Sequence, residues 1–117
     1  MRGLPNYEKD IRPWGHFERF TLNEKSTVKV ITVKPNEQLS LQQHAHRDEA
    51  WHILSGSGTV IVGDIKTAVH PGEDFFVARG VEHRVAGGPN GLVFLEIALG
   101  DFDEADITRL KDNYGRV

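Results

Sequence analysis

Short runs of β-branched and aromatic residues recur along the chain, and this pattern is the strongest constraint on its fold. The runs lie at about 17–22, 26–34, 50–55, 58–62, 73–78 and 92–98. Turn-forming residues separate them, such as Pro35 with Asn36 and Pro71 with Gly72. Many short strands at close spacing are typical of an all-β sandwich or barrel, the jelly roll among them. We therefore predict an all-β fold.

The chain has 117 residues, which is the size of one ordinary domain, and no repeat or low-complexity linker divides it. We predict a single domain over residues 1–117, with an amino-terminal arm over 1–16, a barrel over 17–100 and a short helix over 103–112. The helix prediction depends on Asp103 as an N-cap, with acidic residues in the first turn and basic residues in the last.

The composition excludes several classes of function. There is no cysteine, so disulfide bonds, thiolate metal sites and cysteine nucleophiles are excluded. The formal net charge is −3 with scattered basic residues, which gives no footprint for nucleic acid or an anionic membrane. No segment approaches the roughly 20 apolar residues that span a bilayer, and the amino terminus does not resemble a signal peptide. We expect a cytosolic protein that binds a small molecule.

One group of residues has the chemistry of a metal site. Gln42, His44 and His46 are spaced by two, so on a strand their side chains leave the same face. Glu49 follows His44 by five residues, and His83 comes from a distant part of the chain. An amide, two imidazoles and a carboxylate suit zinc, manganese, iron or nickel and leave a coordination position open. We predict that Gln42, His44, Glu49 and His83 bind one divalent metal ion.

The alternation of side chains along a strand also predicts which way the neighbours of these ligands face. His46 would face the same interior, as a fifth ligand, a proton shuttle or a hydrogen-bond donor to a ligand. Trp51 shares parity with Glu49 and should line the barrel floor, whereas His52 has the opposite parity and should point away.

The spacing resembles the two motifs of the cupin family. The first motif is His-x-His, three or four residues, Glu, six residues, Gly. The second is Gly, five residues, Pro-x-Gly, two residues, His, three residues, Asn. At these positions the chain has Gln42, His44, Glu49 and Gly56, then Gly72, Ala78, Gly80, His83 and Gly87. A His44 and His46 pair would leave too few residues before Glu49. The resemblance implies a single cupin jelly-roll β-barrel.

Within the cupins, the chain resembles the cupin-type (type II) mannose-6-phosphate isomerases. Residues 39–51 are similar to the signature of that family, which also carries a Gln in the site. Residues 12–15, 83–84 and 104–116 resemble other characteristic segments of that family. Ala50 and Ala105 depart from the pattern, since the isomerases usually carry a His and an acid there. Many members also carry a sugar-nucleotide transferase domain before the cupin, but the resemblance covers the cupin alone, so we expect no guanylyltransferase activity.

The resemblance implies an aldose–ketose isomerase that converts mannose 6-phosphate to fructose 6-phosphate through an enediolate. The metal ion would act as a Lewis acid, and His46 is the candidate catalytic base. Arg84, Arg109 and Arg116 are candidates to bind the sugar phosphate, because a guanidinium matches phosphate oxygens in pairs. For Arg84, strand parity indicates the opposite face unless the strand has already ended.

Two other functions remain open: a non-catalytic cupin that binds a sugar or sugar phosphate, and an iron-dependent dioxygenase. We also expect a homodimer, because exposed strand edges in so small a barrel are commonly covered by a partner. Segment 1–16 is the candidate to cross to that partner.

Overall fold

The computed structural model describes residues 3–117, which form nine β-strands and no helix. The strands are β1 (Glu8–Arg12), β2 (Gly15–Arg19), β3 (Ser26–Val33), β4 (Leu41–Gln43), β5 (Glu49–Val62), β6 (Ile65–Val69), β7 (Asp74–Val77), β8 (His83–Leu99) and β9 (Thr108–Lys111). The described part of the chain therefore contains no apolar helix of the length that crosses a bilayer. The prediction of an all-β class is confirmed.

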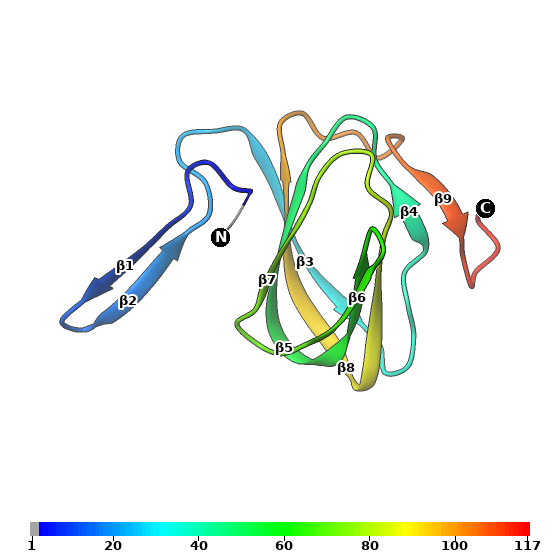
Figure 1. The fold of residues 1–117 in the computed structure, drawn as a ribbon, viewed down its shortest axis with the longest axis horizontal. Coiled ribbons are helices and arrows are strands. Elements are labelled where there is room, and N and C mark those ends of the chain that lie inside the picture. Colours follow the sequence, from blue (N-terminus) through cyan, green and yellow to red (C-terminus); the bar gives the residue numbers. More distant parts are fainter. Residues whose placement is uncertain (1–2) are drawn as a thin grey trace.

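Two long antiparallel strands, β5 and β8, join the two halves of a barrel (Figure 1). Their register extends from Glu49 opposite Ala98 to Val62 opposite His83. In one half, β3 pairs with β8 and β7 pairs with β5. In the other half, β6 pairs with β5 and β4 pairs with β8, with β9 beyond β4. Because both long strands contribute to both halves, their curvature determines which residues meet inside.

The long ladder is interrupted where its register shifts, between Ile53 and Ser55 and between Gly56 and Gly58. Gly56 has a φ of +88°, and a Cβ there would lie 2.2 Å from the carbonyl oxygen of Gly91. Only glycine tolerates both the positive φ and this close approach of two backbones. The glycine at the end of the first motif thus allows β5 to bend.

The core lies between the two halves and is formed by alternate residues of the long strands. Trp51, Ile53, Val60, Val85 and Phe94 are all nearly inaccessible to solvent. The Trp51 ring packs edge-on against Phe94, with ring centroids 5.7 Å apart. Burial of one such large apolar side chain contributes about 1.5–3 kcal/mol to folding. The predicted place of Trp51 inside the barrel is confirmed.

A two-stranded hairpin, β1 with β2, protrudes from the barrel (Figure 1). The run at 17–22 therefore begins in this hairpin and not in the barrel. The base of the hairpin contacts the barrel through a second apolar cluster that includes Tyr7 and Phe20. At its tip, Ile11 and Trp14 are 79% and 73% exposed. Of the predicted arm over 1–16, residues 1–2 lie outside the described part of the chain.

The predicted helix over 103–112 is wrong, because this segment makes turns and then β9, which pairs with β4. The predicted N-cap, Asp103, does accept a hydrogen bond from the backbone N–H of Ala105 at 2.9 Å, but the chain makes only a turn there and no helix follows. Ile107 and Thr108 are β-branched, which favours an extended backbone. Pairing with the edge of β4 therefore outweighs the local helix signals.

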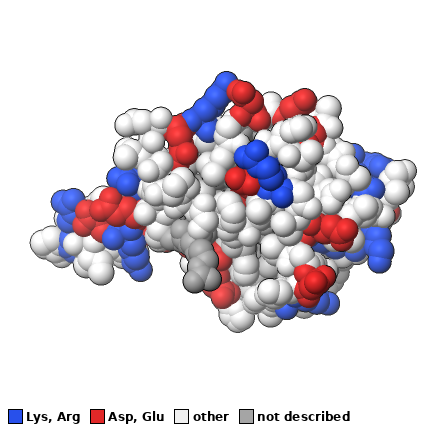
Figure 2. All heavy atoms as spheres, turned by 45° about the horizontal axis from the view of Figure 1, so that its top comes forward, with Lys and Arg blue, Asp and Glu red and all other residues white. Residues whose placement is uncertain are grey.

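Charges of both signs are mixed on the face shown in Figure 2, and uncharged residues separate them. The hairpin carries ion pairs between Arg12 and Asp10 and between Arg19 and Glu8. This face therefore offers nucleic acid no continuous basic surface.

Candidate metal centre

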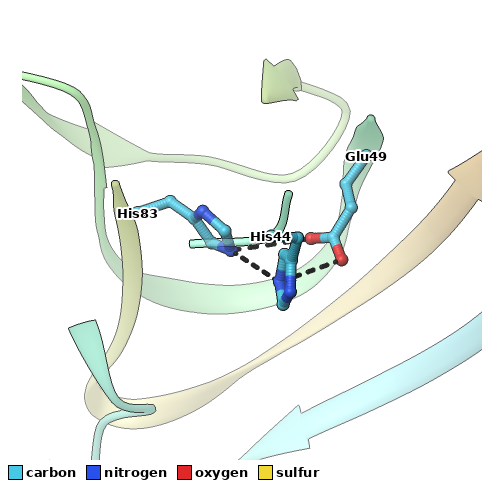
Figure 3. Close-up of side chains that lie close together, drawn as sticks. All are labelled: His44, Glu49 and His83. Atoms are coloured by element: carbon cyan, nitrogen blue, oxygen red, sulfur yellow. Dashed lines mark hydrogen bonds and ion pairs between the residues drawn. The ribbon is translucent and has the colours of Figure 1, made fainter. Parts of the chain in front are cut away.

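Three of the predicted ligands meet inside the barrel (Figure 3). Nε2 of His44 lies 3.4 Å from Oε2 of Glu49 and 3.2 Å from Nε2 of His83. Nε2 of His83 lies 3.8 Å from Oε1 of Glu49. Glu49 and His83 belong to opposite ends of the β5–β8 ladder, and His44 follows β4. Because the barrel is curved, residues at opposite ends of the ladder come within contact distance. All three residues are buried.

Backbone carbonyls fix the orientation of both imidazoles. Nδ1 of His44 lies 2.6 Å from the carbonyl oxygen of Asp106, and Nδ1 of His83 lies 2.9 Å from that of Val81. Since a carbonyl only accepts hydrogen bonds, each Nδ1 donates its proton and each Nε2 presents a lone pair to the centre. Burial lowers the pKa of His83, which favours the neutral form that a metal requires.

The separations of these donor atoms fit a divalent ion. Two donors that each lie about 2.1 Å from a tetrahedral ion are about 3.4 Å apart. The three measured distances, 3.2, 3.4 and 3.8 Å, fall around that value. Two imidazoles and one carboxylate are the donor set of catalytic zinc and non-haem iron sites. The residues therefore fit the group that the sequence predicts.

Gln42 lies beside this centre in the sheet. It is directly opposite His83 on β8 and opposite Arg109 on β9. Directly opposed residues of neighbouring strands project from the same face of a sheet. Gln42 and Arg109 are therefore in one row with His83, which is consistent with the predicted role of the Gln42 amide as a fourth ligand.

Arg47 is part of the centre, although the sequence motifs did not predict it as a site residue. Its Nε donates to Oε2 of Glu49 at 2.8 Å, and its Nη2 lies 3.3 Å from Nε2 of His44. The guanidinium also lies over the ring of Phe102, 4.5 Å from the centroid. The residue is only 7% exposed. Arg47 thus contacts two of the three atoms that would bind a metal, and its spacing of two from Glu49 is the signal that could have revealed it.

Asp106 is a second residue that the sequence did not reveal as part of the centre. Its two carboxylate oxygens accept the backbone N–H groups of Ala45 at 2.8 Å and His46 at 2.9 Å. Its carbonyl accepts from His44. One residue of the carboxy-terminal segment therefore fixes both the backbone and the ring of a metal ligand.

Glu96 adds a buried carboxyl group near Glu49. It is directly opposite Trp51, and Trp51 donates from Nε1 to Oε1 of Glu49 at 3.3 Å. Burial, and then the negative charge of Glu49, raise the pKa of Glu96 to about 7. The interior therefore contains two carboxyl groups, one of which can carry a proton near neutral pH.

We expect Glu96→Gln to remove a pH dependence of stability. Between pH 4.5 and about 7, folded wild-type protein keeps a Glu96 proton that the unfolded chain has lost. The wild-type free energy of unfolding should therefore fall as pH rises through this window. By pH 8 the variant should be the more stable by about 3 kcal/mol, at about 1.4 kcal/mol per pKa unit. Urea unfolding with EDTA between pH 4.5 and 8 measures this, and parallel pH profiles would contradict it.

The prediction that His46 faces the interior is wrong. Its side chain is exposed, because β4 ends at Gln43 and alternation does not continue beyond it. Only its backbone is tied to the centre, through Asp106.

The three predicted phosphate ligands have different surroundings. Arg84 donates from Nε to the carbonyl oxygen of Leu39 at 2.9 Å, in agreement with the parity that turns it away from His83. Arg116 pairs with Asp112 on the surface. Arg109 differs from both, because its Nε is buried and has no hydrogen-bond partner among the residues that the structure describes.

Comparison with known proteins identifies relatives over nearly the whole chain. A family model described as "Mannose-6-phosphate isomerase C-terminal" matches residues 3–112. The xanthan biosynthesis protein XanB of Xanthomonas campestris is 38% identical over 112 residues, which are 94% of this chain and 24% of that protein. The mannose-1-phosphate guanylyltransferase of Escherichia coli K12 is 38% identical over 109 residues, 91% of this chain and 23% of that protein. The chain thus spans about a quarter of the length of these curated relatives.

Solved structures agree on the fold. A cupin-2 domain from Rhodospirillum rubrum has a TM-score of 0.64 and 24% identity, covering 75% of this chain and 64% of that one. Oxalate decarboxylase from Bacillus subtilis has a TM-score of 0.69 and 19% identity, covering 92% and 31%. At such identities the likeness shows the fold alone, and that fold is the cupin barrel.

Proposed function

Because the chain belongs to the family of mannose-6-phosphate isomerase C-terminal domains, we propose that it is a metal-dependent sugar-phosphate isomerase. The substrate would be mannose 6-phosphate and the product fructose 6-phosphate. The observation that carries this proposal is the convergence of His44, Glu49 and His83, with both Nε2 atoms turned to one centre.

One set of residues would bind the metal ion, and another would bind the phosphate group of the sugar. His44, Glu49 and His83 would hold a zinc, manganese, iron or nickel ion, with Gln42 as a fourth ligand. When bound, the ion supplies a Lewis acid for the oxygens at C1 and C2 of the sugar. The buried Nε of Arg109, which has no hydrogen-bond partner within residues 3–117, supports a role in phosphate binding, since a buried donor without a partner is costly unless a ligand satisfies it.

A proton must move between C1 and C2, and two residues are candidates to carry it. His46 is the first candidate, since its backbone N–H is held by Asp106 beside His44 and its exposed ring would have to turn toward the sugar. Glu96 is the alternative, because its raised pKa of about 7 suits a group that both takes and returns a proton. Turnover by His46→Ala and Glu96→Gln would identify the carrier.

The test is turnover of mannose 6-phosphate by protein loaded with each metal in turn, with fructose 6-phosphate measured by a coupled enzyme assay. His70→Ala is the matched control, because His70 is exposed on the surface. We expect turnover in wild type and in this control, and none in protein treated with EDTA. Thermal stabilisation by the sugar phosphate without turnover would favour a binding protein instead.

We further propose a cytosolic homodimer in which the β1–β2 hairpin contacts the second copy. Ile11 and Trp14 at its tip are largely exposed, and so are Val28 and Val30 on β3. Large exposed apolar side chains on a protruding hairpin and on the barrel strand that follows it are typical of protein interfaces. We expect light scattering to give the mass of a dimer for wild type and of a monomer for Trp14→Ser combined with Ile11→Ser. A wild-type monomer would contradict this proposal.

A further inference from the structure

A second group of metal-ligating side chains lies where the hairpin meets the barrel, apart from the centre described above. It consists of Glu18 on β2, His52 on β5 and Asp74 on β7. One donor atom from each lies within 4.8 Å of the other two, and each residue is partly buried. His52 has the opposite parity to Glu49 in β5, so its ring is on the outer face of the barrel strand, as the sequence predicts.

The pairing of strands holds two of these residues together. His52 on β5 is directly opposite Asp74 on β7, and its Nδ1 is hydrogen-bonded to the Asp74 carboxylate. Glu18 is brought to them by the hairpin, whose base packs against the barrel. The Phe20 ring lies 5.3 Å from the His52 ring and 5.8 Å from the Tyr7 ring, centroid to centroid. Aromatic packing therefore places the third ligand in position without depending on an ion.

The charges at this junction are unbalanced. Two carboxylates, Glu18 and Asp74, lie near one another, and no lysine or arginine among residues 3–117 forms an ion pair with either. The Tyr7 hydroxyl donates to Oε1 of Glu18 at 2.6 Å. That hydrogen bond, burial and both carboxylate charges raise the pKa of Tyr7 to about 12. Within the described chain, the His52 imidazole is the one ion-pair partner of either carboxylate.

The donor set suits a divalent ion. Carboxylates and imidazoles are both ligands of manganese, iron and zinc in proteins. Donors on opposite sides of such an ion are about 4.2 Å apart when each bond is about 2.1 Å long. A spread within 4.8 Å therefore needs only small side-chain movements to close around an ion.

We propose that Glu18, His52 and Asp74 form a second divalent-cation site, which fastens the β1–β2 hairpin to the barrel. The ion would bridge β2 of the hairpin to β5 and β7 of the barrel. This site is independent of the isomerase proposal, because it shares no residue with the His44, Glu49 and His83 centre.

Zinc stoichiometry tests the site. Wild-type protein and four variants would be dialysed against dilute zinc chloride, and bound zinc measured by mass spectrometry. We expect two ions per chain in wild type, one in His52→Ala, one in Glu49→Gln, and none in the double variant. His70→Ala, which removes an exposed imidazole beside Glu73, should still bind two. If His52→Ala binds as much zinc as wild type, the second site does not exist, whatever happens at Glu49.

Proteolysis tests the fastening. In the Glu49→Gln background, trypsin should cleave after Lys9 and Arg19 of the hairpin about tenfold more slowly at a zinc concentration ten times the dissociation constant. Adding Asp74→Asn, which keeps the shape of the side chain, should remove this protection. Equal cleavage rates with and without zinc would overturn the role in fastening. Circular dichroism of each variant verifies that the barrel is folded.

Discussion

Replacing Arg47 by methionine is expected to destabilise the metal-free protein and to strengthen its binding of zinc. Arg47 is buried and donates to Glu49 at 2.8 Å. Removal of one partner from a buried ion pair leaves the other charge uncompensated, which costs about 3–5 kcal/mol. Urea unfolding in EDTA should show this loss. Arg79→Met is the control, because Arg79 is exposed and pairs with Asp48 at the surface, where an ion pair contributes about 0–1 kcal/mol.

The gain in affinity follows from competition for the same atoms. The Arg47 guanidinium contacts Oε2 of Glu49 and Nε2 of His44, and an ion must take both. Without the guanidinium, zinc no longer competes with a hydrogen-bonded cation for Oε2 of Glu49 and Nε2 of His44. We expect Arg47→Met to bind zinc at least about tenfold more tightly in calorimetry, a gain of about 1.4 kcal/mol. Weaker binding would show instead that Arg47 orients Glu49 for the ion.

The sequence predicted the centre well where motif spacing and strand parity act together. His44, Glu49 and His83 were identified from residue type and spacing, and the structure brings them together. Trp51 was placed correctly because β5 is long and regular there. Long paired strands make alternation a reliable guide, since a shift by one residue would expose the apolar face.

The sequence failed where an element is short or where distant segments decide its structure. Strand β4 ends at Gln43, so alternation could not place His46. The segment over 103–112 has the local signals of a helix, but its partner is the edge of β4, which no local pattern reveals. Arg47 was not predicted because a metal-ligand motif consists of neutral and anionic donors and contains no cation that competes for them. Each failure concerns a short element, a contact between residues far apart in the sequence, or a group of unexpected charge.

Glu49→Gln is expected to have the largest effect on metal binding. The carboxylate is the one anionic ligand at the centre, and the amide offers only a weak neutral oxygen. Loss of a group that merely supports a ligand lowers affinity about 10–100-fold, so loss of the ligand itself should exceed 100-fold. Zinc calorimetry measures this, with Glu82→Gln, a change of an exposed carboxylate, as the control. The proposed isomerase activity should disappear in the same variant.

A double-mutant cycle then separates the metal from the ion pair. In metal-free protein, Glu49→Gln leaves the buried Arg47 charge without its partner and should cost about 3–5 kcal/mol. Arg47→Met combined with Glu49→Gln removes both charges, so the double variant should be less destabilised than the sum of the two single variants. The coupling energy should exceed about 0.5 kcal/mol, because the two groups are in direct contact. Additive losses would mean that the pair contributes nothing of its own, and that the Nε1–H of Trp51 holds the buried carboxylate instead.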